Sequence, residues 1–164
     1  MHYKKSKFGS QDMSDRAKVK IIPPVIPAIS IALGGIIQFV YPVKILSTGM
    51  LFPLGIAMVV MSVLIVAAAL KEIIAAKTAF DVRKTTTSLV TTGIFNYSRN
   101  PTYLSMMLLC FGVALIVNSL PILVTSALTG SALCLLVIRQ EETYLQDKFG
   151  SQYSIYKGVV RRWA

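Results

Sequence analysis

The sequence has few of the residues that build metal sites and disulfide frameworks. Among 164 residues there is one histidine, His2, and there are two cysteines, Cys110 and Cys134. One histidine excludes a histidine-rich metal site, and no other residues have the spacing of zinc ligands, so we expect no metal. In an antiparallel pair of helices the two cysteines differ in depth by roughly 9 Å, at about 1.5 Å per residue, so we expect no disulfide between them.

Charge is also scarce, and long segments have none. Charged residues make up 15% of the chain, hydrophobic residues 54%, and the mean hydropathy is +0.64. Residues 21–41, 45–70 and 100–138 contain no charge at all. A membrane-crossing helix needs about 20 apolar residues. The first two segments supply one helix each, and the third is long enough for two, because the sequence NSLP at residues 118–121 is typical of a turn.

These segments predict an all-α integral membrane protein with four transmembrane helices. We expect the spans at about 21–41, 46–70, 101–118 and 120–139, within a single membrane domain of residues 21–164. Between spans 2 and 3 lies a loop, residues 71–99, and a C-terminal segment of residues 140–164 follows span 4. Residues 1–20 form a basic tail ahead of the first span.

The positive charge falls on one side of this topology. The net charge is +10, and of the 17 lysines and arginines all but Lys44 lie in the tail, in the 71–99 loop, at Arg139 where span 4 ends, or in the C-terminal segment. That distribution follows the positive-inside rule, so we expect both termini in the cytoplasm. Anionic lipid headgroups account for the basic charge, and nucleic acid is not needed as a partner. We expect a multi-pass protein of a prokaryotic plasma membrane.

The C-terminal segment carries an aromatic stripe. Its apolar residues repeat at intervals of four and three and are Phe149, Tyr153, Tyr156, Val160 and Trp163. Such spacing is typical of one face of a helix. With Lys157, Arg161 and Arg162 beside the stripe, it predicts a helix that lies in the membrane interface.

Two polar clusters are predicted at one depth. Counted from a turn near residues 119–120, Arg99 lies about 20 residues before it and Glu141 about 22 after it, so residues 99–103 and 139–142 should face each other. The acidic pair can hold an ammonium group, and Arg99 or Arg139 can hold a carboxylate. Aromatic faces suit a flat base or a sulfonium. Alternatively, these residues are ordinary anchors at the membrane–water boundary, and Arg99 forms an ion pair with Glu141.

The stretches LVTTGIFNYSRNPTYLSMM and EETYLQDKFGSQYSIYK, with the predicted hairpin between them, resemble the isoprenylcysteine carboxyl methyltransferase family. The resemblance covers about residues 80–164 and extends more loosely to membrane phospholipid and small-thiol methyltransferases. The matching residues are Leu89, Val90, Gly93, Phe95, Arg99, Asn100, Pro101, Tyr103, Glu141, Glu142, Leu145, Phe149, Gly150, Tyr153 and Tyr156.

The resemblance implies an enzyme that transfers a methyl group from S-adenosyl-L-methionine to a lipid or prenylated acceptor from the bilayer. It implies a cofactor site beneath the cytoplasmic face, formed by the loop, the Arg-Asn-Pro motif and the first glutamate. Its residues are Thr87, Ser88, Leu89, Val90, Phe95, Arg99, Asn100, Pro101, Thr102, Tyr103 and Glu141. On the substrate side the resemblance suggests Arg139 and Glu142. The spacing between Arg139 and the glutamates departs from the family pattern.

One departure from the family pattern bears on the acceptor. Asn100 stands where many members have histidine, and asparagine cannot accept a proton at neutral pH. A carboxylate, with a reference pKa of about 4, needs no base, whereas an amine with a reference pKa of about 10 must first lose a proton. The sequence therefore favours carboxyl O-methylation of an isoprenylcysteine-like substrate.

Other readings remain. Glu142, Asp81 or Tyr103 could act as a base, which keeps a phospholipid N-methyltransferase open, and a thiol S-methyltransferase is compatible as well. A relative that reduces lipids with a nicotinamide cofactor fits the paired motifs less well. A small four-span transporter or a membrane scaffold needs no cofactor, but no ionisable residue lies within the four predicted spans, as proton-coupled transport generally requires.

Overall fold

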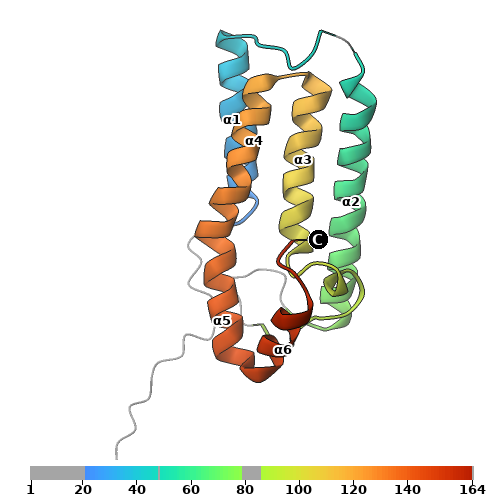
Figure 1. Ribbon diagram of the computed structural model, residues 1–164, viewed down its shortest axis with the longest axis vertical. Coiled ribbons are helices and arrows are strands. Elements are labelled where there is room, and N and C mark those ends of the chain that lie inside the picture. The colour runs from blue at the N-terminus through green and yellow to red at the C-terminus, as the bar shows by residue number, and fades with distance from the viewer. Residues whose placement is uncertain (1–20, 48, 79–85, 164) are drawn as a thin grey trace, which may run out of the picture.

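The computed structural model describes residues 21–47, 49–78 and 86–163, and the chain forms a bundle of helices there (Figure 1). The predicted basic tail, residues 1–20, and Asp81 of the loop lie outside these residues. In chain order the elements are α1 (Val25–Val40), α2 (Leu51–Ala75), the 3-10 turn η1 (Gly93–Asn96), α3 (Pro101–Val117), α4 (Leu120–Leu133), the π-helical turn η2 (Cys134–Ile138), α5 (Arg139–Phe149) and α6 (Ser151–Val159). The all-α prediction is confirmed for the described residues.

The four apolar helices coincide with the four predicted spans. Helix α1 begins only at Val25, because Pro23 and Pro24 precede it, and proline is best tolerated at a helix start. Helix α2 runs on to Ala75, beyond the uncharged segment, since Lys71 and Glu72 are compatible with a helix. The structure therefore places the helices where hydropathy does and shifts their ends by a few residues.

The turn between α3 and α4 lies at the predicted position. Asn118 adopts the left-handed conformation at the end of α3, with a φ of 52°, and the Ser119 hydroxyl accepts a hydrogen bond from the Ile122 amide at 3.2 Å. The side chain of Asn118 accepts from the amides of Ile45 and Leu46 at 3.1 and 3.2 Å and donates to the Leu46 carbonyl at 2.7 Å. These bonds attach the α1–α2 connection to the turn.

Glycines allow close contact between neighbouring helices. Helix α2 packs on α3, α3 on α4, and α4 on α1. A Cβ on Gly112 of α3 would lie 2.7 Å from Val59 Cγ2 and 2.9 Å from the Gly55 carbonyl oxygen, both of α2. A Cβ on Gly34 of α1 would lie 2.5 Å from Thr125 Oγ1 of α4. Only a residue without a side chain fits at these contacts.

Large apolar side chains cover the outside of the bundle. Phe39 of α1 is 91% exposed and Leu64 of α2 is 58% exposed, for example. Helix α2 and the continuous helix Leu120–Phe149 are long and apolar enough to cross a membrane, whereas α1 and α3 are shorter apolar helices of 16 and 17 residues. These features fit a membrane protein, and the crossing of the bilayer by all four helices stays a prediction.

A π-helical turn joins α4 to α5 within one long helix (Figure 1). The Arg139 amide donates to the carbonyl of Cys134, five residues earlier, instead of four as in an α-helix. The extra residue changes which face α5 presents to the rest of the molecule. Both cysteines are free, as expected.

The aromatic stripe of the C-terminal segment does not face the membrane interface. Tyr153 and Tyr156 are 2% and 9% exposed, and Val160 is likewise buried. Together they pack against Leu89, Leu145 and Phe149. The prediction that this stripe contacts the membrane was wrong, because the loop after α2 and helix α5 cover it. A repeat of apolar residues shows that a helix face is covered and does not show by what.

Candidate functional site

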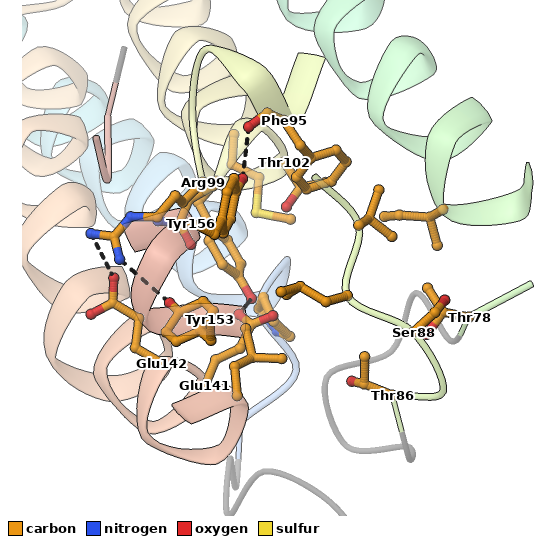
Figure 2. A pocket seen from close by; sticks show the side chains of 18 of the residues that line it. Thr78, Thr86, Ser88, Phe95, Arg99, Thr102, Glu141, Glu142, Tyr153 and Tyr156 are labelled. Carbon is orange, nitrogen blue, oxygen red and sulfur yellow. Dashed lines mark hydrogen bonds and ion pairs between the residues drawn. The ribbon is translucent and has the colours of Figure 1, made fainter. Parts of the chain in front are cut away.

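A pocket opens at the end of the bundle where α1 begins and α2 ends. Its cavity has a volume of about 260 Å³. The start of α1, the end of α2, the loop of residues 86–90, η1, the start of α3, α5 and α6 all contribute to its lining. Figure 2 shows side chains from these elements directed toward one another around the cavity.

Most of the residues predicted to bind a cofactor line this pocket. They are Ser88, Leu89, Val90, Phe95, Arg99, Asn100, Thr102, Tyr103 and Glu141, and Glu142 joins them. Their convergence confirms that the two polar clusters counted from the turn face each other. Their roles in binding and catalysis stay predictions.

Three predicted site residues do not line the pocket. Thr87 is exposed, and its hydroxyl donates to the Lys77 carbonyl at 3.0 Å. Pro101 is buried as the first residue of α3, where it starts the helix. Arg139 is exposed at the start of α5. Thr87 and Pro101 are therefore chain neighbours of lining residues without lining the pocket themselves, and Arg139 also lies outside it.

Tyr103 and Glu141 join the two motifs. The Tyr103 hydroxyl donates to Glu141 Oε2 at 2.8 Å, and Tyr103 is only 4% exposed. Glu141 lies on α5, beyond the uncharged segment. Its burial raises the pKa of its carboxyl group to about 7, the bond from Tyr103 opposes that rise, and the charge of Glu142 adds to it. A cation in the pocket would favour the ionised form of Glu141.

Arg99 reaches the same region from the end of the loop. Its Nη2 lies 3.3 Å from Glu142 Oε1, and its Nη1 donates to the Tyr153 hydroxyl at 3.5 Å. The Arg99 side chain is 9% exposed, and its Nε is buried with no hydrogen-bond partner among the residues that the structure describes. Buried donors are rarely left unpaired, so this nitrogen is a donor whose partner the described residues do not supply.

Glu142 is held by a second arginine. Arg162 donates from Nη2 to Glu142 Oε2 at 2.6 Å and from Nε to Glu142 Oε1 at 3.0 Å. This is a two-pronged contact, the geometry in which arginine binds carboxylates most strongly. It takes both carboxylate oxygens of Glu142, whereas Arg99 shares only one of them.

The chain after α6 crosses the Arg-Asn-Pro motif. The Arg99 amide donates to the Arg161 carbonyl at 3.0 Å. The Ser98 hydroxyl donates to the Arg162 carbonyl at 3.2 Å, and the side-chain nitrogen Nδ2 of Asn100 donates to the same carbonyl at 3.1 Å. The segment after α6 is therefore attached to the motif whose residues line the pocket.

The loop before α3 is fastened on both sides. The Ser88 hydroxyl donates to the Ala76 carbonyl at 2.8 Å, and the Thr86 amide donates to the Tyr144 hydroxyl at 3.1 Å. Gly93 has a φ of 57°, a left-handed conformation that glycine adopts without strain. Its Cα lies so near Glu72 that a side chain would collide with the carboxyl group.

Sequence reasoning missed several residues of the pocket. Tyr153 and Tyr156 were assigned to a membrane-facing stripe, yet both line the cavity, and the Tyr156 hydroxyl donates to the Phe95 carbonyl at 2.7 Å. Their match to the second motif was the available signal. Thr78 and Thr86 also line the pocket, and no pattern in the sequence marks them.

The pocket combines opposite charges with an apolar wall. Glu141 supplies a negative group, Arg99 supplies a partly unpaired positive one, and aromatic rings lie nearby. The apolar part comes from Ile22, Pro23, Pro24, Ile73, Met106 and Leu145. Such a lining suits a ligand with a zwitterionic head, and leaves an apolar side for a second molecule. The described residues contain no cluster of three potential metal ligands.

Comparison with known proteins agrees with this geometry. Residues 50–152 match the phospholipid methyltransferase family. An uncharacterized protein of Haemophilus influenzae is 43% identical over 67 residues, which are 37% of this chain and 97% of that protein. No solved structure matches the chain. The family resemblance seen in the motifs is confirmed, and the chain belongs to the phospholipid methyltransferase family, a family of integral-membrane methyltransferases.

Proposed function

We propose that the protein transfers a methyl group from S-adenosyl-L-methionine to a lipophilic acceptor at the cytoplasmic face of the membrane. The observation that carries this proposal is that Glu141 and the incompletely bonded Arg99 both line one pocket. The family supports methyl transfer in general, and methyltransferases of this family typically use that cofactor. The choice of acceptor rests on the site.

The residues of the pocket fit the cofactor. Glu141 suits its ammonium or sulfonium charge, and the unpaired Nε of Arg99 suits its carboxylate. The rings of Phe95, Tyr153 and Tyr156 can pack against the flat adenine. Bound there, the cofactor supplies an electrophilic methyl group.

The protein contributes orientation and exclusion of water. Glu141 and Arg99 would fix the two charged ends of the cofactor, so that the methyl group points in one direction. The apolar residues at the start of α1 and on α3 and α5 keep water from the acceptor side. Neither contribution requires a covalent bond to the protein.

For the acceptor we favour a carboxylate, as in an isoprenylcysteine-like substrate. Two of the three residues suggested as bases are engaged, since Glu142 is bound through both oxygens by Arg162 and Tyr103 donates to Glu141. The third, Asp81, lies outside the described residues. Burial raises the pKa of Tyr153 to about 12, so it also stays protonated at neutral pH. A carboxylate is ionised already and needs none of them.

One observation favours a phospholipid amine as the second candidate. The pKa of Glu141 is raised to about 7, which is the range in which a carboxylate acts best as a general base at neutral pH. Glu141 could then take a proton from an ammonium headgroup, provided that it is not bound to the cofactor. The family is equally compatible with this acceptor. A thiol acceptor would follow the same geometry.

The apolar wall supports a substrate from the bilayer. A lipid chain could remain in hydrocarbon and present only its reactive head, gaining about 0.8 kcal/mol per methylene relative to water. Anionic lipid headgroups are the expected neighbours of the basic surface. Arg139, exposed at the start of α5, is positioned to meet them or a substrate carboxylate.

The experiment is transfer of labelled methyl from the cofactor to three acceptors in detergent-purified protein. We expect a farnesyl-cysteine analogue to be methylated far better than a short cysteine thioether, with a base-labile ester as product. A stable N-methyl product from phosphatidylethanolamine would replace the carboxylate proposal by the second candidate. Absence of cofactor binding at millimolar concentration would refute methyl transfer altogether and leave a transporter or scaffold.

A further inference from the structure

Arg162 lies two residues from the end of the chain and contacts three parts of the site. Its side chain binds both oxygens of Glu142, its Nη1 lies 3.5 Å from Cys134 Sγ in the π-helical turn, and its carbonyl accepts from Ser98 and Asn100. It therefore links the turn before α5, the second glutamate and the Arg-Asn-Pro motif. Its side chain is not among those that line the pocket.

The two arginines bind Glu142 unequally. Arg162 makes two short contacts at 2.6 and 3.0 Å, whereas Arg99 makes one contact at 3.3 Å. Arg99 is the more deeply buried of the two, with a side chain 9% exposed against 34% for Arg162. Arg162, the more exposed arginine, therefore supplies most of the positive charge that neutralises Glu142. Arg99, the more buried one, keeps an unpaired Nε.

We infer that Arg162 is a positioning residue that frees Arg99 to bind the anionic end of the ligand. The inference rests on the function proposed above. Without Arg162, the half-buried carboxylate of Glu142 would have Arg99 as its remaining cationic partner among the described residues. A buried carboxylate with one cation draws that cation into a tight pair. Arg99 would then turn from the pocket toward Glu142 and lose its capacity for a carboxylate ligand.

The same residue attaches the C-terminal end to the motif. Three hydrogen bonds run from residues 98–100 to the carbonyls of Arg161 and Arg162. The contact of the Arg162 side chain with Glu142 is a further anchor of this segment, besides the packing of Val160 and Trp163. Loss of that anchor should loosen the backbone of the motif as well as change the position of Arg99.

The test compares Arg162→Ala with Arg161→Ala, which removes the same charge from an exposed neighbour. Binding of two ligands to purified full-length protein is measured by calorimetry. S-adenosylhomocysteine carries the carboxylate, and methylthioadenosine lacks the whole amino-acid end. We expect Arg162→Ala to weaken the binding of S-adenosylhomocysteine about 10- to 100-fold, which is the scale of one charge-assisted contact. The binding of methylthioadenosine should weaken less than about threefold. Arg161→Ala should leave both unchanged.

Chemical rescue supplies a readout that a purely structural role would not give. Guanidinium at non-denaturing, millimolar concentration should restore part of the S-adenosylhomocysteine affinity of Arg162→Ala, and leave the wild type and Arg161→Ala unaffected. Arg162→Lys should retain part of the affinity, since lysine keeps the charge and loses the two-pronged geometry. Equal weakening of both ligands without rescue would overturn the positioning role.

A second measurement does not depend on any ligand. The Arg99 amide bonds to the Arg161 carbonyl, so its hydrogen exchange reports whether the segment stays in place. Exchange in residues 98–103 should become at least about tenfold faster in Arg162→Ala and stay unchanged in Arg161→Ala. If the wild type binds neither ligand, the proposed function fails. The hydrogen-exchange result still decides whether the Arg162 side chain holds residues 98–103 in place. Unchanged exchange in Arg162→Ala would refute the coupling even in an active enzyme.

Discussion

Replacement of Glu141 by glutamine tests the charge at the centre of the pocket. The amide oxygen of a glutamine can still accept the hydrogen bond that Tyr103 donates at 2.8 Å, so the local packing should survive. What disappears is the negative charge that faces a cationic ligand. A hydrogen bond to a charged group contributes about 1.5–3 kcal/mol, which corresponds to roughly 10- to 150-fold in the dissociation constant.

The pH dependence of binding gives the same prediction a second form. The pKa of Glu141 is raised to about 7 without ligand, and the ionised form binds a cation. Wild-type affinity should therefore be highest above about pH 7 and fall as pH is lowered, by up to about tenfold per pH unit well below 7, because protonation of Glu141 competes with the ligand. The glutamine variant should bind weakly with no such slope.

The assay is calorimetric titration of S-adenosylhomocysteine between about pH 5.5 and 7.5, where its ammonium group stays protonated. Asp147→Asn is the matched control, because Asp147 lies on the same helix, is exposed and does not line the pocket. It should bind like the wild type at every pH. If Glu141→Gln retained the affinity or the pH slope of the wild type, the assignment of Glu141 as the partner of the ammonium group would be refuted.

Two further predictions concern the bundle. In a cysteine-free background, a membrane-impermeant maleimide should label Lys44→Cys from outside intact cells and leave Lys157→Cys protected; labelling of position 157 from outside would contradict cytoplasmic termini. Gly112→Val should destabilise the protein by about 1–3 kcal/mol in a thermal unfolding assay, because the new side chain meets Val59 at the α2–α3 contact. Gly35→Ala should not destabilise the protein, because nothing lies within 4 Å of the new carbon. If the two substitutions destabilised the protein equally, the α2–α3 contact at Gly112 would not be tight.

The bundle was predictable because its determinants are local. Hydropathy separates three apolar segments, and Asn118 with Pro121 marks the turn that divides the third into two helices. Counting from that turn also places Tyr103 near Glu141, since a helix advances a fixed distance per residue. Helix ends were less predictable, because charged residues such as Lys71 can continue a helix beyond its apolar part.

The contacts made by the end of the chain were not predictable. Tyr153 and Tyr156 form an evident stripe, but their spacing is the same whether lipid or protein covers it. The alternative reading of the sequence paired Arg99 with Glu141, whereas its partner is Glu142, a difference of one helical position that depends on the rotation of α5. Arg162 belongs to no spacing pattern, and its place in the site follows only from how the chain folds back after α6.

That rotation has a single cause, the π-helical turn at Cys134–Ile138. Each residue of an α-helix turns the chain by about 100°, so one surplus residue in the turn sets the angular offset between the membrane half and the site half of one continuous helix. The sequence on either side can drift by substitution without altering that offset. Loss or gain of one residue between Leu133 and Arg139 would instead swing both glutamates away from the pocket together. For this protein we therefore expect the length of that segment to matter more than the identity of its residues, and insertions and deletions there to be more damaging than substitutions.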